Sequence, residues 1–458
     1  MTARVLALMV ASALVLGVGL WLRNRTPSAG GSVRSTVPAD GRRETFSVTY
    51  TVEIRPHDPG TAWIRWELAG VDEVARLRLK LDAERFGEFR GSGVIEQDRS
   101  EVRWTPGAPY AHLSYRVSID HRHGPGKGYD SYVGDGWIIS RMGALFPRST
   151  VTFRTGVEPS PESRARLVFR LPAGWDVATV MPPAGSRAFV VESPRSRFDH
   201  PRGWLVLGRF RRADATIAGT AVTVAASYEA PLSPGRVIRF IEKALPALAA
   251  IFAQVSPRLL IVSGPDPMWH GGLSGEQSFY IHAARPLRTP DRTSPYLHEL
   301  FHVLAPFRPA PDARWVTEGL AELYSLDIQR RVGRLDDQGY AKGLHLFRRY
   351  GAWGSDFTRK PNAAVLNNSA PLIMHVLDRR IRRVTNGLRG LDDVVAALAS
   401  EGGVVSTARF LGTVRRVAGK SFGDFFRRHV YRGERPAPDD LPPLGLAPER
   451  PATTPYRR

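Results

Sequence analysis

Hydrophobic residues recur with two different periods along the chain. Between residues 44 and 232, apolar and polar residues alternate in short runs such as Thr45–Ile54, Trp63–Leu68 and Ala165–Leu171, with Gly, Pro and Asp clusters between the runs. Alternation of this kind places every second side chain on one face of a β-strand. The pattern therefore predicts a β-sandwich domain over residues 44–232.

After Ser233 the apolar period becomes that of an α-helix. Residues 237–255 are predicted to form an amphipathic helix with a kink at Pro246, because proline lacks the amide hydrogen that continues a helix. Helical patterns continue to about residue 430. We expect a mainly helical second domain over residues 233–434 and an α+β fold class, with a proline-rich tail over residues 435–458.

The N-terminal segment is apolar without interruption. Val5–Leu22 contains no charged residue and, as a helix, would reach about 27 Å, close to the ~30 Å of a bilayer core. Residues 1–25 are therefore predicted to be a membrane anchor or a signal segment, and residues 26–43 a flexible linker. We favour the anchor, since no small-residue cleavage site directly follows the apolar run. The expected protein is single-pass with its bulk exported, or secreted if the segment is cleaved.

Composition narrows the possible functions. The 458 residues include 64 Lys and Arg against 44 Asp and Glu, a net charge of +20, and no cysteine. The absence of cysteine excludes disulfides, thiol nucleophiles and thiolate metal sites. The positive charge suggests nucleic acid, but the chain has no phosphate loop, zinc-finger or RNA-recognition pattern. We therefore expect no nucleic-acid partner. The basic residues beside the N-terminal segment are expected to contact anionic lipid, which explains part of the positive charge.

The strongest chemical pattern lies on a predicted helix that begins at Ser294, with Pro295 in its first turn. His298 and His302 stand four residues apart on one face of this helix, close enough to share one ion, and Glu299 lies beside them. This His-Glu-x-x-His arrangement is typical of zinc hydrolases, in which two imidazoles bind Zn²⁺ and the glutamate acts as general base. The alternative is a chance match on an ordinary helix with solvated histidines.

A third ligand is predicted on the next helix, which begins near Asp312. Glu318 follows His302 by 16 residues, a span that lets a helix, a short loop and a second helix converge on one ion. Glu322 lies on the same face and is predicted to accept a hydrogen bond from a ligand imidazole. Three protein ligands with an open position are typical of catalytic zinc. A solvated acidic face is the alternative for both glutamates.

Two predicted strands, residues 257–263 and 279–282, flank a glycine-rich loop upstream of these helices. In peptidases an edge strand beside the metal pairs with an extended peptide substrate. Gly271 and Gly272 are therefore candidate substrate-binding residues. Glu276 either receives a substrate amino terminus or is an ordinary loop glutamate, and both interpretations stay open.

Several segments resemble the glycyl-aminopeptidase family of zinc peptidases, peptidase family M sixty-one: Gly271–Leu273, His298–His302, Trp315–Glu322, residues 376–394 and residues 425–433. The resemblance covers residues 258–446. It implies a thermolysin-like catalytic domain of the gluzincin type behind a β-sandwich. It also implies that Zn²⁺ is bound by His298, His302 and Glu318, with Glu299 as the base.

The chain departs from this family in three respects. Ser274 and Gly275 stand where the family commonly has Glu-His, and residues 367–370 stand where it commonly has an oxyanion-stabilising tyrosine. No PDZ domain, which many members carry, is expected to follow. Four residues are candidates to replace this tyrosine: Tyr324, Tyr340, His345 and His375. Of these, Tyr340 is the candidate substrate-binding residue.

These observations predict a membrane-tethered zinc metallopeptidase that hydrolyses peptide bonds in peptides or proteins, with aminopeptidase activity as the narrower expectation. The alternative is a catalytically impaired, zinc-binding module of the same fold at the membrane surface. The sequence leaves the oligomeric state open.

Overall fold

The computed structural model describes residues 45–82, 84–107, 109–154, 162–192, 198–252 and 256–444. The predicted anchor and linker lie outside these ranges, as does the end of the proline-rich tail. Within the described residues, no helix has the length and apolar character needed to cross a membrane. All of the described residues belong to one compact unit.

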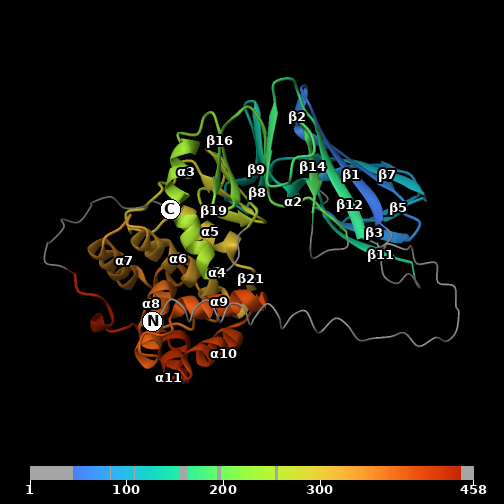
Figure 1. The fold of residues 1–458 in the computed structure, drawn as a ribbon. Coiled ribbons are helices and arrows are strands. Elements are labelled where there is room, and N and C mark those ends of the chain that lie inside the picture. Colours follow the sequence, from blue (N-terminus) through green and yellow to red (C-terminus); the bar gives the residue numbers. More distant parts are fainter. Residues whose placement is uncertain are drawn as a thin grey trace, which may run out of the picture. The chain divides into compact units, whose positions relative to one another are not determined.

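The N-terminal domain is built from β-strands (Figure 1). A six-stranded sheet has the order β14-β12-β1-β2-β7-β4, and its strands are β14 (Ala188–Val191), β12 (Glu162–Arg170), β1 (Thr45–Arg55), β2 (Asp58–Ala69), β7 (Tyr110–Ser118) and β4 (Phe86–Gly91). A four-stranded sheet consists of β11 (Arg148–Phe153), β3 (Val74–Lys80), β6 (Glu101–Thr105) and β5 (Val94–Gln97). One hydrophobic core takes side chains from both sheets, for example Trp66 and Trp104. The predicted alternation of apolar residues is what supplies this shared core.

A third sheet links the two domains. Its strands are β13 (Asp176–Thr179), β15 (Trp204–Gly208), β10 (Trp137–Arg141), β9 (Tyr129–Gly134) and β8 (His121–Arg122). The short helix α2 (Met142–Leu145) follows β10 directly. Side chains on one face of this sheet, including Trp204 and Val206, share a core with Val262 and Tyr280 of the C-terminal domain. Both faces of β15 are therefore buried.

The sheet of the C-terminal domain has the order β16-β17-β18-β20-β19. Its strands are β16 (Phe210–Ile217), β17 (Thr220–Ser227), β18 (Arg258–Gly264), β20 (Ser278–His282) and β19 (Gly272–Gly275). The domain boundary predicted near residue 232 is therefore too late, because β16 and β17 pair with catalytic-domain strands. Their sequence alternates like the strands before them, and only the pairing of β17 with β18 shows where they belong.

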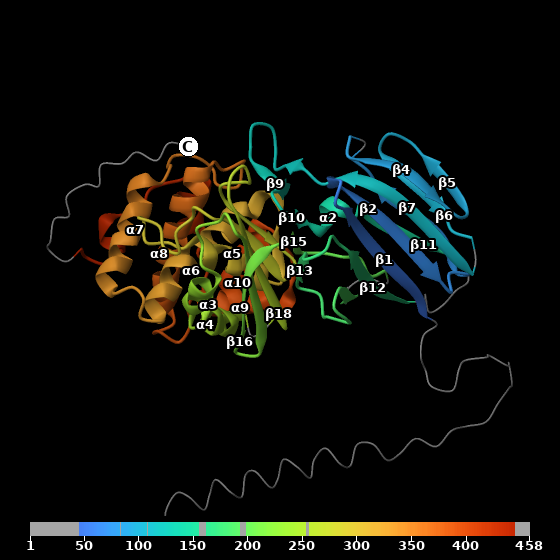
Figure 2. The ribbon, with the colours of Figure 1, turned by 90° about the horizontal axis from the view of Figure 1, so that it is seen from above.

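Helices cover one face of this sheet, and its other face packs on the third sheet (Figure 2). They are α3 (Pro234–Ile241), α4 (Ala244–Phe252), α5 (Pro295–Leu304), α6 (Arg314–Arg331), α7 (Asp337–Tyr350), α8 (Ala370–Val384), α9 (Leu391–Glu401), α10 (Thr407–Ala418) and α11 (Gly423–Phe426). The predicted kinked helix over residues 237–255 is two helices, α3 and α4. Pro246 lies in the first turn of α4, where a proline needs no amide hydrogen.

The described part of the proline-rich tail packs against α7. His345 contacts the Pro442 carbonyl oxygen with its ring nitrogen at 3.0 Å, and Arg348 donates to the Pro436 carbonyl oxygen at 3.2 Å. A short 3-10 turn, Pro438–Asp440, lies between these contacts. The first ten residues of the predicted tail are therefore a strap on the helical domain.

Candidate metal centre

The helix with the paired histidines begins where its sequence predicts. The Ser294 hydroxyl accepts the Leu297 amide hydrogen at 3.4 Å, and Pro295 occupies the first turn of α5. Leu297, Leu300 and Phe301 are fully buried in the helical core. Their burial fixes the rotation of α5 about its axis, which leaves the neighbouring face, with its two histidines, free for other contacts.

His298, His302 and Glu318 converge on one point from α5 and α6. The Nε2 atoms of the two imidazoles lie 3.2 Å apart. Glu318 Oε2 lies 3.3 Å from Nε2 of His298 and 3.6 Å from Nε2 of His302. The three predicted ligands therefore form a single cluster of metal-binding type.

This spacing fits Zn²⁺. A tetrahedral zinc ion with bonds of about 2.0–2.1 Å places neighbouring ligand atoms about 3.3 Å apart. The His298 Nδ1 contacts Glu322 Oε2 at 2.7 Å, so in the neutral ring Nδ1 carries the proton and Nε2 is an acceptor. Nε2 then faces the Glu318 carboxylate, which is also an acceptor. A cation between them satisfies both.

The charges around His298 point the same way. Burial lowers the pKa of His298, but Glu318 and Glu322 outweigh that effect and raise the pKa well above its usual value. The site therefore draws a positive charge, and in a metal-free protein a proton takes that place. Glu322 fixes the orientation of the ring and favours its ligating nitrogen, as the sequence predicts for this position.

Glu299 lies beside the cluster, only 8% exposed. Burial raises its pKa above the ordinary value, although the two histidines oppose this. A raised pKa suits a carboxylate that accepts a proton near neutral pH. The side chain packs against Gly272 of β19: a Cβ atom at Gly272 would lie 2.4 Å from Glu299 Oε1. Of the predicted Gly-Gly pair, Gly272 thus makes room for the carboxylate, while Gly271 lies against Trp269.

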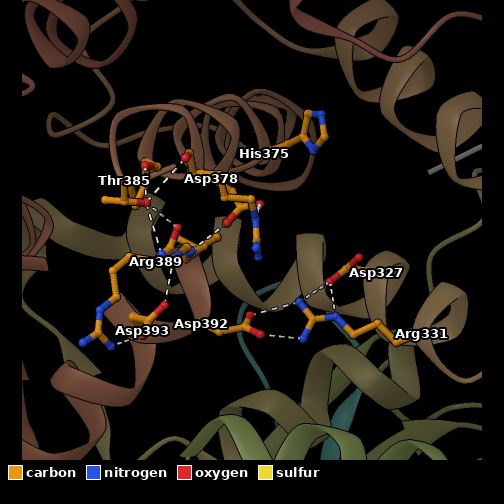
Figure 3. Close-up of polar contacts among 12 residues, drawn as sticks. Asp327, Arg331, His375, Asp378, Thr385, Arg389, Asp392 and Asp393 are labelled. Carbon is orange, nitrogen blue, oxygen red and sulfur yellow. Dashed lines mark hydrogen bonds and ion pairs between the residues drawn. The ribbon is translucent and has the colours of Figure 1, made fainter. Parts of the chain in front are cut away.

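The helix that carries Glu318 is held on two sides. The Tyr324 ring stacks on Phe301 of α5 with centroids 5.5 Å apart, and its hydroxyl donates to Asp392 of α9 at 2.7 Å. Arg331 lies between Asp327 and Asp392 and bonds both carboxylates, which Figure 3 shows. Gly319 lets α8 approach closely, because a Cβ there would lie 2.9 Å from Ala370 Cβ. A glycine in the interior of a helix indicates close approach of a neighbouring element, and α8 is that element at Gly319.

The four residues considered as substitutes for the family's tyrosine all make contacts elsewhere. Tyr324 binds Asp392, as described above. Tyr340 and His375 contact each other through the tyrosine hydroxyl and Nδ1 at 3.2 Å, and both are buried. His345 contacts the tail at Pro442. Residues 367–369 belong to a π-helical turn, Val365–Ser369, that packs against α6.

The predicted glycine-rich loop contains a strand. β19 pairs with β20 in antiparallel register and lies at the edge of the sheet. Gly272 therefore belongs to an edge strand beside the metal centre, the element that the sequence argument requires for substrate binding. Glu276 follows β19 and forms an ion pair with Arg202 at 3.3 Å.

A second cluster of possible ligands was not predicted from the sequence. Asp266, His270 and His282 bring ligand atoms within 4.8 Å of one another. Here, however, His282 Nδ1 accepts the Ala284 amide hydrogen at 3.2 Å, so the proton of the neutral ring is on Nε2 and faces Asp266. This is the opposite of the His298 arrangement, because a ring N–H faces the carboxylate, whose Oδ1 also contacts His270 Nε2 at 2.5 Å. Asp266 and His270 lie outside any helix and His282 ends β20, so no helical period along the sequence relates them.

No family model and no curated protein matches the sequence. Solved structures are similar in fold. An aminopeptidase N family protein from Idiomarina loihiensis is 14% identical, with a TM-score of 0.66 over 85% of this chain and 76% of that protein. An M1 zinc metallopeptidase from Deinococcus radiodurans is 16% identical, with a TM-score of 0.55 over 88% of this chain and 96% of that protein.

The protein thus has the mixed α/β, two-domain fold of these zinc peptidases, with a β-rich N-terminal domain. A variant of the Deinococcus radiodurans protein has been solved with a Tyr-Ser-Ala substrate. One neighbour is described as an aminopeptidase N family protein and the other as a zinc metallopeptidase, in agreement with the zinc-peptidase resemblance in sequence. The narrower assignment to family M sixty-one stays a prediction.

Proposed function

We propose that the protein is a zinc-dependent peptidase that hydrolyses peptide bonds. The observation that supports this best is the cluster of His298, His302 and Glu318 at the spacing of a tetrahedral zinc site. The buried carboxylate of Glu299 lies next to it, and the structural neighbours are zinc peptidases.

In this proposal each residue has a separate task. His298, His302 and Glu318 would hold Zn²⁺, which would supply Lewis-acid polarisation of the scissile carbonyl group and lower the pKa of a water molecule. Glu299 removes the proton from the attacking water and later delivers it to the leaving amine. Glu322 keeps the His298 ring in its ligating orientation. The edge of β19, with Gly271 and Gly272, aligns the substrate backbone.

Zinc content and hydrolysis test this proposal together. The purified full chain is expected to bind one zinc ion and to cleave members of a peptide library. Glu299→Gln keeps the zinc but lowers kcat by several orders of magnitude, because it removes the proton acceptor. A protein that binds no zinc, or a Glu299→Gln variant with full activity, would refute the proposal.

The second candidate is a zinc-binding module without peptidase activity. The contacts of four side chains favour it, those of Tyr324, Tyr340, His345 and His375. Each is bonded to another part of the protein, so none of the four is available as an oxyanion donor at the metal cluster. Stoichiometric zinc without cleavage of any library peptide would support it.

For both candidate functions we propose that residues 1–25 tether the protein to the membrane. The test is extraction of membranes with alkaline carbonate: a tethered protein stays with the membrane, and release of the protein would refute the proposal.

A further inference from the structure

Arg141, the last residue of β10, is half-buried without a hydrogen bond from its guanidinium group to any described residue. Its Nε atom is covered, and its ion-pair contact is Asp130 Oδ2 at 3.9 Å, beyond hydrogen-bonding distance. Burial lowers the pKa of Arg141. The comparably buried Arg85, by contrast, donates to three backbone carbonyl groups, those of Ser118, Ile119 and Ala144. The buried Nε donor without a partner costs free energy, and the rest of the half-buried guanidinium is open to an acceptor.

Arg141 is connected to the proposed substrate strand, β19, through Trp204. Its guanidinium lies 5.0 Å from the Trp204 ring centroid, and the Trp204 indole donates to the Leu273 carbonyl oxygen of β19 at 3.0 Å. A positive group therefore lies against the tryptophan that is hydrogen-bonded to the edge strand.

Negative groups that would bind a substrate amine are engaged elsewhere along this edge. Side chains alternate along a strand, so Ser274 faces the same side as Gly272, toward Glu299, and it carries no charge. Glu276 is paired with Arg202. Asp130 is already contacted by His121, with Nδ1 and Oδ1 2.5 Å apart. The carboxylates of Glu276 and Asp130 are therefore already engaged by other side chains.

We propose that Arg141 binds a carboxylate group of the peptide substrate. Arg141 is then a specificity-determining residue. This inference rests on the proposed peptidase function and specifies its substrate class. A guanidinium group binds a carboxylate through two parallel hydrogen bonds, a geometry that lysine does not offer. The carboxylate is either an acidic side chain near the scissile bond or the C-terminus of a short peptide.

Binding to the Glu299→Ala variant tests this without requiring hydrolysis. Zinc-loaded Glu299→Ala protein is titrated by calorimetry with isosteric peptide pairs: Asp against Asn and Glu against Gln at each position, and tripeptide acids against tripeptide amides. We expect about 10- to 100-fold tighter binding of the acid member in one of these sets, as for a hydrogen bond to a charged group. The set that discriminates identifies the source of the carboxylate.

Adding Arg141→Gln is expected to abolish this discrimination, while Arg141→Lys retains part of it. The control is Arg212→Gln, which removes an exposed arginine paired with Asp214 on β16 and leaves the discrimination unchanged. The inference is wrong if no pair discriminates, or if Arg141→Gln weakens acid and neutral members equally, as a purely structural role would. If the discrimination is present but the wild type cleaves none of the peptides, the inference stands and the peptidase function fails.

Discussion

Replacing Gly272 by alanine tests the proposed base, Glu299, without substituting Glu299 or any candidate zinc ligand. The new Cβ would lie 2.4, 2.6 and 2.7 Å from Oε1, Cγ and Cδ of Glu299. Ordinary van der Waals contact begins at 3.4 Å, so the carboxylate has to move by about 1 Å. The Gly272 backbone does not have a positive φ, so alanine adds no strain of its own.

A displacement of this size has a known order of magnitude. Moving a reacting group by 1 Å costs about 10²-fold in rate, which corresponds to about 2.7 kcal/mol in the activation free energy. We therefore expect Gly272→Ala to lower kcat/KM about 100-fold. Zinc content should stay at one ion per chain, because the contact is with Glu299 and not with the histidines.

The assay is peptide cleavage with zinc analysis on the same preparations. Gly412→Ala is the matched control, since a Cβ at Gly412 of α10 meets nothing within 4 Å. In a Glu299→Ala background the steric partner is gone, so adding Gly272→Ala should cause no further loss. Nearly full activity in the single variant, or loss of its zinc, would refute the reasoning.

Three further perturbations address the cluster and its support. Glu322→Gln should weaken zinc binding about 10- to 100-fold, measured by chelator competition, because the bond to the ligand ring is weakened; unchanged affinity would contradict its orienting role. Gly319→Ala should lower the free energy of unfolding by about 1–3 kcal/mol, despite the better helix propensity of alanine, since its Cβ would lie 2.9 Å from Ala370 Cβ; an unchanged or higher Tm would show that α8 yields freely. Burial lowers the pKa of His375 from 6.5 to about 4. The unfolded chain therefore takes up this proton first, and stability is complete above pH 6.5 and declines as the pH falls toward 4, by at most about 3 kcal/mol. His375→Asn should flatten part of this decline in denaturant titrations, and an identical pH dependence would count against it.

The sequence by itself determined the parts of the site that depend on local geometry. His298, Glu299 and His302 lie within one turn of a helix whose start is encoded by Ser294, so their relative placement follows from the helical period. Glu318 and Glu322 follow by the same rule on the next helix. Strands and helices with a clear apolar period could likewise be located, since burial on one face imposes that period.

The tertiary structure decided which elements meet. Two adjacent strands, β16 and β17, look like the N-terminal strands in sequence but pair with the C-terminal sheet. Gly272 contacts Glu299, and Arg141 contacts Trp204, which bonds the same edge strand, although nothing in the local sequence predicts either contact. Contacts of this kind depend on packing between distant segments, which have no periodic trace along the chain. The sequence thus defined the candidate metal ligands, while the fold placed what surrounds them.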